Sequence, residues 1–211
     1  LANHLKIKMQ KVNKVLFPLS ELAVGVACGA SDWTTAIASN PVVGAMADLL
    51  GEQGGTIAMT ETSGIPGTEN ILAARAVNKR VAADIYLISA YHAKQAYLRY
   101  DCPIHHINPT PGNKAGGITT MVEKGIGNIE KVGHGTIFGV VNWGEYLPGP
   151  GVWIMKDSGI GPDIFTIAGL SCGGCQVVVF TTGAGSPIGS ALGPVIKVTG
   201  NPDTAVSFQE N

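Results

Sequence analysis

Residues 108–117 read NPTPGNKAGG and place one lysine, Lys114, among two prolines, two asparagines and three glycines. Proline fixes the backbone φ angle, whereas glycine lets a backbone approach a ligand closely. This combination predicts a backbone shaped around something small, with Gly112 and Asn113 beside it. Lys114 would then face a carboxylate, or act as a base if desolvation lowers its pKa. The alternative is an ordinary loop lysine in water.

A second set of reactive side chains lies in CGASD (28–32), which offers a thiol, a hydroxyl and a carboxylate within five residues. A Cys28 thiolate would bind a soft or borderline metal, and Asp32 would add a harder ligand. Ser31 supplies the hydroxyl. For Cys28 the alternative is a small buried hydrophobic residue. Glu61 ends an apolar run, where a carboxylate faces either a site or solvent.

The stretch TTGAGSPIGS (181–190) is rich in glycine, whose free backbone amides can bind an anion. It lacks the Lys-Ser/Thr ending of a P-loop, and its spacing matches no dinucleotide-binding fingerprint. A small carboxylate would fit as well as a phosphate. Thr181 and Thr182 add two hydroxyls at its start.

The pair CGGC (172–175) has the spacing of a redox motif or of half a zinc site. Only one such pair exists, so a complete zinc site would need a further cysteine or histidine. We therefore favour a simpler interpretation, in which the two glycines end a helix before the strand QVVVF. His105 and His106 are adjacent, and in an extended segment at most one of them would face a site.

Short apolar runs alternate with longer amphipathic segments along the chain, which predicts an α/β fold: a single domain with a mainly parallel, Rossmann-like sheet flanked by helices. Strands are expected at 22–29, 56–61, 152–158, 176–182 and 194–200. Helices are expected at 41–53, 68–98, 118–132 and 163–174, whereas 133–151 is expected to be irregular.

In such sheets ligands bind beyond the carboxyl ends of the strands. Four predicted strands end in small, polar, glycine-rich segments, at 28–32, 60–64, 156–163 and 181–186. We therefore expect all four segments to meet at one edge of the sheet and to form one shared polar site.

Composition limits the classes of partner. Hydrophobic residues make up 45% of the 211 residues and charged residues 14%, about half the usual charged share of ~25%. A formal net charge of −1 gives no basic surface for nucleic acid. No apolar run approaches the ~20 residues that span a membrane. Four cysteines without a dense framework fit a reducing, cytoplasmic location.

The start of the chain, LANHLKIKMQK, lacks the apolar core and the cleavage site of a signal peptide. Its apolar spacing predicts a leader helix over 1–16, followed by an α/β domain over 17–211. There is no initiator methionine, and the end SFQEN has no closing element. We therefore expect a C-terminal part of a longer protein whose N-terminal segments are missing here.

Several motifs together resemble the C-terminal region of the altronate/galactarate dehydratase family: PLSELAVGVACGASD, NPVVGAMADLLGEQGGT, NPTPGNKAGGITTMVEKGIGNIEKVG, IMKDSG and VVVFTTGAGS. The resemblance runs from about Phe17 to Thr199, and NPTPGNKAGG is its most specific part. The chain departs from the family at Ala184, where an arginine is common. It also departs at Ala30, where CGGSDG is more usual than CGASDW.

The resemblance implies a sugar-acid hydro-lyase that uses a divalent metal, typically Fe2+, to convert a hexonate or hexarate into a 2-keto-3-deoxy acid. It also implies roles for the residues singled out above. Cys28 and Glu61 would hold the metal, and Lys114, Asn113 and Asp32 would be catalytic. The substrate would be bound by Ser31, Gly112, Ser158, Thr181 and Thr182.

Two alternatives stay open. A related branch of the family eliminates sulfite from sulfolactate, and a non-catalytic module that binds small carboxylates would use the same polar groups. The expected partner is a small sugar acid, with no nucleic acid and no membrane, and the sequence leaves a homo-oligomer open. Because family segments that complete the site are absent, we expect the chain alone to be inactive.

Overall fold

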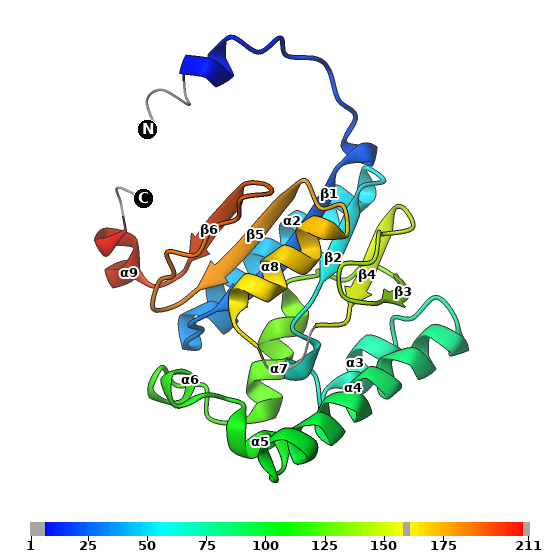
Figure 1. The fold of residues 1–211 in the computed structure, drawn as a ribbon, viewed down its shortest axis with the longest axis vertical. Helices are drawn as coiled ribbons and strands as arrows, with labels where there is room; N and C mark the ends of the chain where they lie inside the picture. The colour runs from blue at the N-terminus through cyan, green and yellow to red at the C-terminus, as the bar shows by residue number, and fades with distance from the viewer. Residues whose placement is uncertain (1–6, 158–160, 209–211) are drawn as a thin grey trace.

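The computed structural model describes residues 7–157 and 161–208, and it is built around a six-stranded sheet in which every pairing is parallel (Figure 1). The strand order is β3-β4-β2-β1-β5-β6. The predicted α/β class with a parallel sheet is therefore confirmed. The strands are β1 (Ala23–Gly29), β2 (Thr56–Met59), β3 (Ile137–Val141), β4 (Gly151–Met155), β5 (Val177–Thr182) and β6 (Val195–Thr199).

Helices connect and cover these strands. They are α2 (Asn40–Glu52), α3 (Glu69–Ala73), α4 (Lys79–Tyr100), α5 (Ile104–Ile107), α6 (Pro111–Ala115), α7 (Met121–Glu130), α8 (Asp163–Cys172) and α9 (Pro202–Ser207). Short helical turns add η1 (Leu19–Glu21), a π-helical η2 (Thr35–Ser39) and η3 (Thr62–Gly64). No helix among the described residues is both long enough and apolar enough to cross a membrane.

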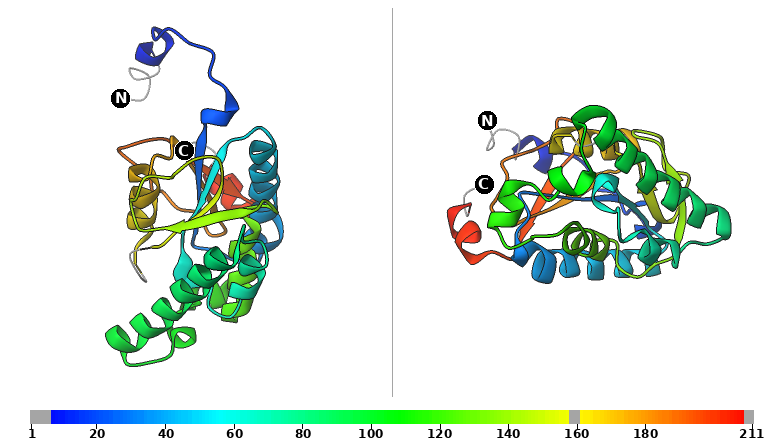
Figure 2. Two further views of the ribbon diagram at one scale, coloured as in Figure 1. Left: turned by 90° about the vertical axis from the view of Figure 1, so that its right-hand side faces the viewer. Right: turned by 90° about the horizontal axis from the view of Figure 1, so that it is seen from below.

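The two faces of the sheet have separate hydrophobic cores. One core joins β1 and β2 to apolar side chains of α2, α3 and α4, and the other packs β1, β4 and β5 against α8. In Figure 2 α8 and α2 lie on opposite sides of the sheet. β1 is buried on both faces, as the near-continuous apolar run AVGVACG predicts for a central parallel strand. Gly25 makes room there, since a Cβ atom would lie 2.9 Å from Leu170 of α8.

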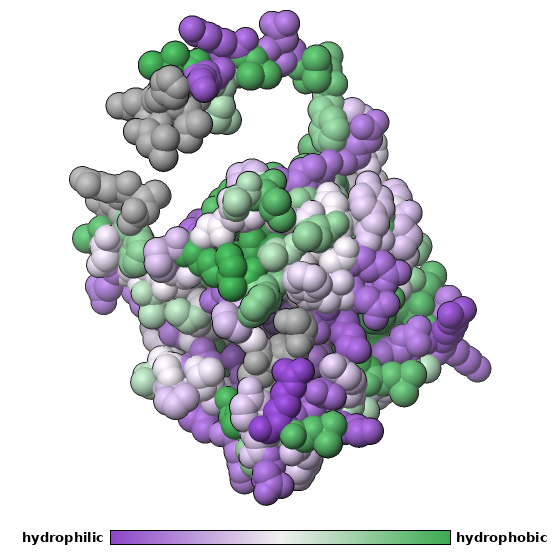
Figure 3. Space-filling model, viewed as in Figure 1, coloured by the Kyte–Doolittle hydropathy of each residue, from purple (hydrophilic) through white to green (hydrophobic). Residues whose placement is uncertain are grey.

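β6 is one of the two edge strands, and it is covered less completely than the strands at the centre of the sheet. Ile196 of β6 is exposed, as are Ile164 and Phe165 at the start of α8. On the face shown in Figure 3, apolar atoms gather over α8 and the β5–β6 side of the sheet.

Three sequence-based expectations about elements need correction. Residues 133–151, expected to be irregular, contain β3, which pairs with β4 and also meets Ala76 in an isolated bridge. That bridge interrupts the helix expected over 68–98, and Asn78 restarts it as α4 by accepting a hydrogen bond from the Val81 amide. In the leader segment only residues 7–10 of the described part are helical, and residues 11–18 are exposed. These exposed residues do not pack against another element of the structure, so tertiary packing does not stabilise a helix there.

The four polar strand ends do meet at one edge of the sheet, as expected. β1 and β5 are neighbours in register, with Cys28 opposite Thr181. β2 lies on the other side of β1, and β4 lies beside β2. Because all strands run in the same direction, their carboxyl ends share one edge, below which α5, α6 and α7 lie (Figure 1).

Candidate functional site

A cavity of about 400 Å3 lies between this sheet edge and the segments α5 to α7. Each of the four strand ends contributes to its wall, through Cys28 near the end of β1, Glu61 after β2, Asp157 after β4 and Ala184 after β5. Four segments far apart in the sequence therefore build one polar site. Its other polar lining residues are Ser31, Asp32, Ser63, Asn108, Thr110, Asn113, Lys124, Asn128, Asp163 and Thr166.

Glu61 and Ala30 both line the cavity and have left-handed backbones, and Glu61 is the one with a reactive side chain. Its φ angle of 62° is left-handed, which is unusual for a residue with a side chain and is found preferentially at functional sites. Its Oε2 atom accepts hydrogen bonds from the Cys28 amide, at 2.9 Å, and from the amine of Lys131. The Asn128 side chain donates to its carbonyl at 3.2 Å. The strained residue is thus fixed through both its side chain and its backbone.

Lys131 has no exposed surface and forms an ion pair with Glu61. Burial opposes the charge of this amine, but the interactions with Cys28 and Glu61 outweigh burial and raise the pKa of Lys131 above its ordinary value. The lysine therefore stays protonated as a fixed cation beside the cavity. Burial, followed by the charge of Glu61, also raises the pKa of the Cys28 thiol above its ordinary value.

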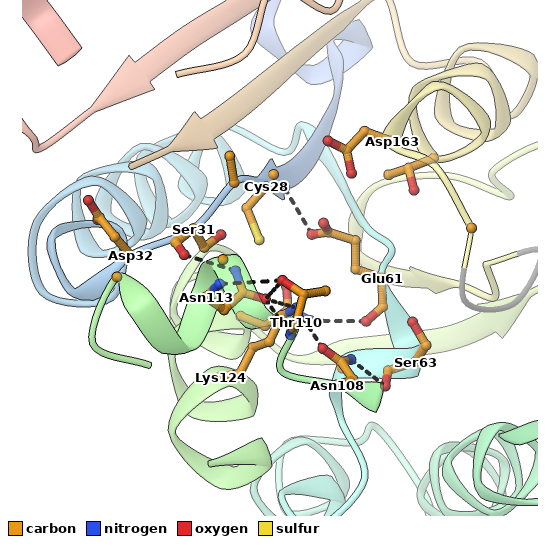
Figure 4. Close-up of a pocket in the computed structure, with 18 of the residues that line it drawn as sticks. Cys28, Ser31, Asp32, Glu61, Ser63, Asn108, Thr110, Asn113, Lys124 and Asp163 are labelled. Atoms are coloured by element: carbon orange, nitrogen blue, oxygen red, sulfur yellow. Dashed lines mark hydrogen bonds between the residues drawn. The ribbon is translucent and has the colours of Figure 1, made fainter. Parts of the chain in front are cut away.

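Lys124 is the amine that lines the cavity itself. It donates hydrogen bonds to the side-chain oxygens of Asn108, at 2.7 Å, and Asn113, at 2.9 Å. Asn108 in turn donates to the Ser63 carbonyl, and Asn113 donates to the Ser31 carbonyl. Figure 4 shows this network below Cys28 and Glu61. The two asparagines therefore hold Lys124 between the ends of β1 and β2.

The segment NPTPGNKAGG thus orients Lys124, which lies outside it, and not Lys114, which lies within it. Thr110 and Asn113 form a reciprocal cap that starts α6, and the Asn113 side chain is buried against the end of β1. Lys114 lies on the outer face of this short helix, is exposed, and does not line the cavity. This placement argues against the catalytic role expected for Lys114 and leaves Lys124 as the amine at the site. Gly112 does line the cavity, as expected.

Asp32 lines the cavity, but its carboxylate is used within the protein. One oxygen accepts from the Thr34 hydroxyl and the Thr35 amide, and the other accepts from the Asn201 side chain. Burial favours the neutral acid, yet these hydrogen bonds lower the pKa of Asp32 below its ordinary value. The expected catalytic role of Asp32 therefore gains no support, because its lone pairs are occupied.

The two threonines expected to bind substrate are buried and do not line the cavity. Thr181 donates to Asn40 at 2.7 Å, and Thr182 accepts from the Gly185 amide at 3.1 Å. Both hydroxyls therefore hold the fold together, which corrects their predicted role. Ser31 lines the cavity as expected, and Ser158 falls outside the described residues.

The remaining reactive side chains are not at the cavity. The two glycines of CGGC follow the end of α8 as expected, and Cys175 is buried in the core, where burial raises its pKa to about 12. Cys172 is exposed and free. His105 and His106 are both exposed on α5.

Two residues that the family resemblance assigns to a divalent metal, Cys28 and Glu61, line the cavity. Among the described residues no three or more His, Cys, Asp or Glu side chains are grouped so as to hold an ion. One Glu61 oxygen contacts the ammonium of Lys131, which leaves the other oxygen for an ion. The ligand role of Cys28 and Glu61 stays a prediction.

Asp163 was not singled out from the sequence, although the segment that contains this residue, 156–163, was expected to reach the site. Asp163 opens α8, and its carboxyl faces the cavity near Glu61 and Cys28 in Figure 4. Asn128 also went unnoticed. It is buried in the cavity wall, and its side-chain oxygen has no hydrogen-bond partner among the described residues. A buried acceptor without a hydrogen-bond partner is typical of a site that a ligand completes.

Comparison with known proteins gives a consistent result. A family model described as "D-galactarate/Altronate dehydratase, C-terminal" matches residues 19–211. Altronate dehydratase of Bacillus subtilis is 40% identical over 185 residues, which are 87% of this chain and 36% of that protein. Galactarate dehydratase (L-threo-forming) of Escherichia coli is 34% identical over 193 residues, 90% of this chain and 36% of that protein.

The name of a third relative refers to a different leaving group from that of the dehydratases. The (2R)-sulfolactate sulfo-lyase subunit beta of Chromohalobacter salexigens is 36% identical over 194 residues, which are 92% of this chain and 49% of that protein. The chain thus spans between a third and a half of the length of these relatives.

Proposed function

Because this chain belongs to the D-galactarate/altronate dehydratase family, as its C-terminal domain, we propose that the protein containing it eliminates water from a hexonate or hexarate and yields a 2-keto-3-deoxy acid. The observation that supports this best is the composition of the cavity. It combines an amine, four carboxyl groups and several hydroxyls and amides within about 400 Å3. A polyhydroxy acid needs such a mixture of donors and acceptors.

In this proposal Lys124 binds the substrate carboxylate. Two of its three N–H donors go to Asn108 and Asn113, which leaves one for a ligand in the cavity. Ser31, Ser63 and Thr110 line the same space and serve the substrate hydroxyls. The unpartnered oxygen of Asn128 accepts a hydrogen bond from a further substrate hydroxyl. These contacts orient the carbon that carries the acidic proton.

Glu61 is the base that removes this proton. Its backbone and one carboxylate oxygen are fixed by Asn128, Cys28 and Lys131, so the other oxygen is presented in a defined direction. Lys131 does not reach the cavity and acts as a positioning residue for Glu61. An oriented base contributes ~10²–10⁴-fold to such a proton transfer.

The proposal is tested with the full-length protein and a panel of hexonates and hexarates, with 2-keto acid as the readout. The matched pair Lys124→Met and Lys114→Met removes one ammonium group each, at the cavity and on the surface. We expect Lys124→Met to lower kcat/KM by about 10²-fold, the scale for one lost electrostatic contact, and Lys114→Met to leave it unchanged. Equal effects of the two changes would overturn the assigned role of Lys124.

An iron requirement, which the family resemblance implies, is tested in the same assay by comparing added Fe2+ with a chelator.

A second candidate is the elimination of sulfite from sulfolactate, which the Chromohalobacter relative supports. The chemistry is the same up to the leaving group. Adding sulfolactate to the panel and measuring sulfite separates the two functions. Binding without turnover of any of these acids by metal-supplemented protein would instead favour a non-catalytic carboxylate-binding module.

A further inference from the structure

Asp163 presents its carboxyl to the cavity (Figure 4). It opens α8 and lines the cavity, and no described residue donates a hydrogen bond to its carboxyl. The end of β1 is shaped to admit it, since a Cβ atom at Gly29 would lie 2.2 Å from its Oδ2 atom. Asp32, by contrast, has both oxygens occupied by described partners. The carboxylate of Asp32 is thus used in hydrogen bonds within the protein, whereas the carboxyl of Asp163 is open to the cavity.

The surroundings of Asp163 differ from those of Glu61, although both carboxyls line the same cavity. Glu61 is in direct contact with the ammonium of Lys131. Asp163 has no such contact. Burial, followed by the charge of Glu61, raises the pKa of Asp163 to about 6, and the more distant amines of Lys124 and Lys131 only partly oppose this. The other titratable groups of the wall are Cys28, Asp32 and Asp157.

Two carboxyl groups in different environments can divide the work of an acid and a base. We propose that Asp163 is the general acid that protonates the departing hydroxyl group, while Glu61 removes the proton next to the substrate carboxylate. This inference rests on the function proposed above. It adds a catalytic residue that comes from α8, on the opposite face of the sheet from α7, which supplies Lys124.

The proposed step balances as follows. The C–H bond at the carbon beside the carboxylate breaks, its proton goes to Glu61, and its electron pair forms an enediolate. The C–O bond at the next carbon then breaks, and the leaving oxygen takes the proton of Asp163 and departs as water. The resulting enol tautomerises to the 2-keto acid. Exchange with solvent returns a proton to Asp163 and removes one from Glu61.

The test uses the full-length protein with Asp163→Asn and, as a matched control, Asp203→Asn. Asp203 occupies the first turn of α9, is exposed and lies outside the cavity. We expect Asp163→Asn to lower kcat by about 10²-fold or more with little change in KM, because general acid catalysis contributes ~10²–10⁴-fold. Asp203→Asn should match the unchanged enzyme.

Exchange of the substrate's acidic hydrogen in D2O separates an acid from a structural residue. Asp163→Asn should keep this exchange while elimination falls, whereas Glu61→Gln should lose both. If Asp163→Asn is poorly folded by thermal unfolding, Asp163→Glu keeps a carboxyl displaced by one methylene, and it should retain exchange with a reduced kcat.

Normal turnover by Asp163→Asn would overturn the inference, and so would an equal loss of exchange and elimination. A lack of turnover of every acid by the unchanged enzyme would overturn the proposed function instead.

Discussion

At the scale of single residues, a lysine without exposed surface holds the strained Glu61 in place at the end of β2. The pair is costly to break, because removing one partner leaves the other charge desolvated. Lys131→Met keeps the length of the side chain and removes the charge. We expect it to lower the free energy of unfolding by about 3 kcal/mol, measured by urea denaturation.

The surface change Lys114→Met is the control and should alter the same free energy by no more than about 0.5 kcal/mol. Adding Glu61→Gln to Lys131→Met should restore part of the loss, because the unpaired carboxylate is then gone. An additive effect of the two changes would show that the ion pair contributes no coupling.

The pKa of Asp163 predicts how stability depends on pH. Because the folded pKa, about 6, lies above the ordinary value of 3.8, the folded protein favours the protonated form. The resulting stabilisation is complete below pH 3.8 and is lost as the pH rises through about 6. Asp163→Asn cannot ionise, so it should be more stable than the unchanged protein at pH 8. At pH 4.5 the difference should shrink to about a third of its value at pH 8 in urea titrations, and a constant difference at both pH values would contradict the prediction.

At the scale of elements, α7 is the helix that positions the site, since it carries Lys124 and Asn128 and leads into Lys131. It can do so because it packs very closely against α2. A Cβ atom at Gly44 of α2 would lie 2.1 Å from the backbone oxygen of Glu130. Backbone cannot move aside as a flexible side chain can, so a larger residue at this position must push the two helices apart.

Gly44→Ala should therefore destabilise the protein by about 1–3 kcal/mol, the range for overpacking. Gly51 is the control in the same helix, because a Cβ atom there meets nothing within 4 Å. Gly51→Ala should stabilise the protein by up to about 1 kcal/mol through the lower entropy of the unfolded chain. Thermal unfolding of both variants measures the contrast, and a loss of stability in Gly51→Ala similar to that in Gly44→Ala would refute close packing as its cause.

At the scale of the whole molecule, the sheet brings chain segments from both sides of β1 to one cavity, at the point where the strand order reverses between β2 and β5. This is where open α/β sheets generally bind their ligands. The chain spans only 36% of the length of its altronate dehydratase relative from Bacillus subtilis. A site wall on this domain and further groups on other parts of the protein would together surround the substrate.

We therefore expect residues 1–211 alone to bind the acid that the full-length protein turns over, but not to convert it. Isothermal titration of the chain, with Lys124→Met as a control that weakens binding, checks the first part. A 2-keto acid assay checks the second. Turnover by the chain alone within tenfold of the full-length rate would contradict the prediction.

The sequence by itself determined the sheet and the edge at which the site forms. Buried parallel strands appear in the sequence as short apolar runs. The polar segment after each run, such as CGASD (28–32), is recognised from neighbouring residues alone. The sequence also marked Cys28, Ser31 and Glu61 at strand ends, and Gly112 and Asn113 in the loop 108–117, as site residues, and all five line the cavity. β3 was not predicted, because its pairing with β4 and Ala76 cannot be inferred from its own five residues.

Only the tertiary structure decided which charged groups face the cavity. Lys114 and Lys124 lie ten residues apart, and the direction of each amine depends on which helix face packs inward. The carboxylates of Asp32 and Asp163 look alike in sequence, yet hydrogen bonds from Thr34, Thr35 and Asn201 occupy one and leave the other open. Burial and contact, which set the charge of Lys131 and Asp163, are properties of the packed chain and not of any local pattern.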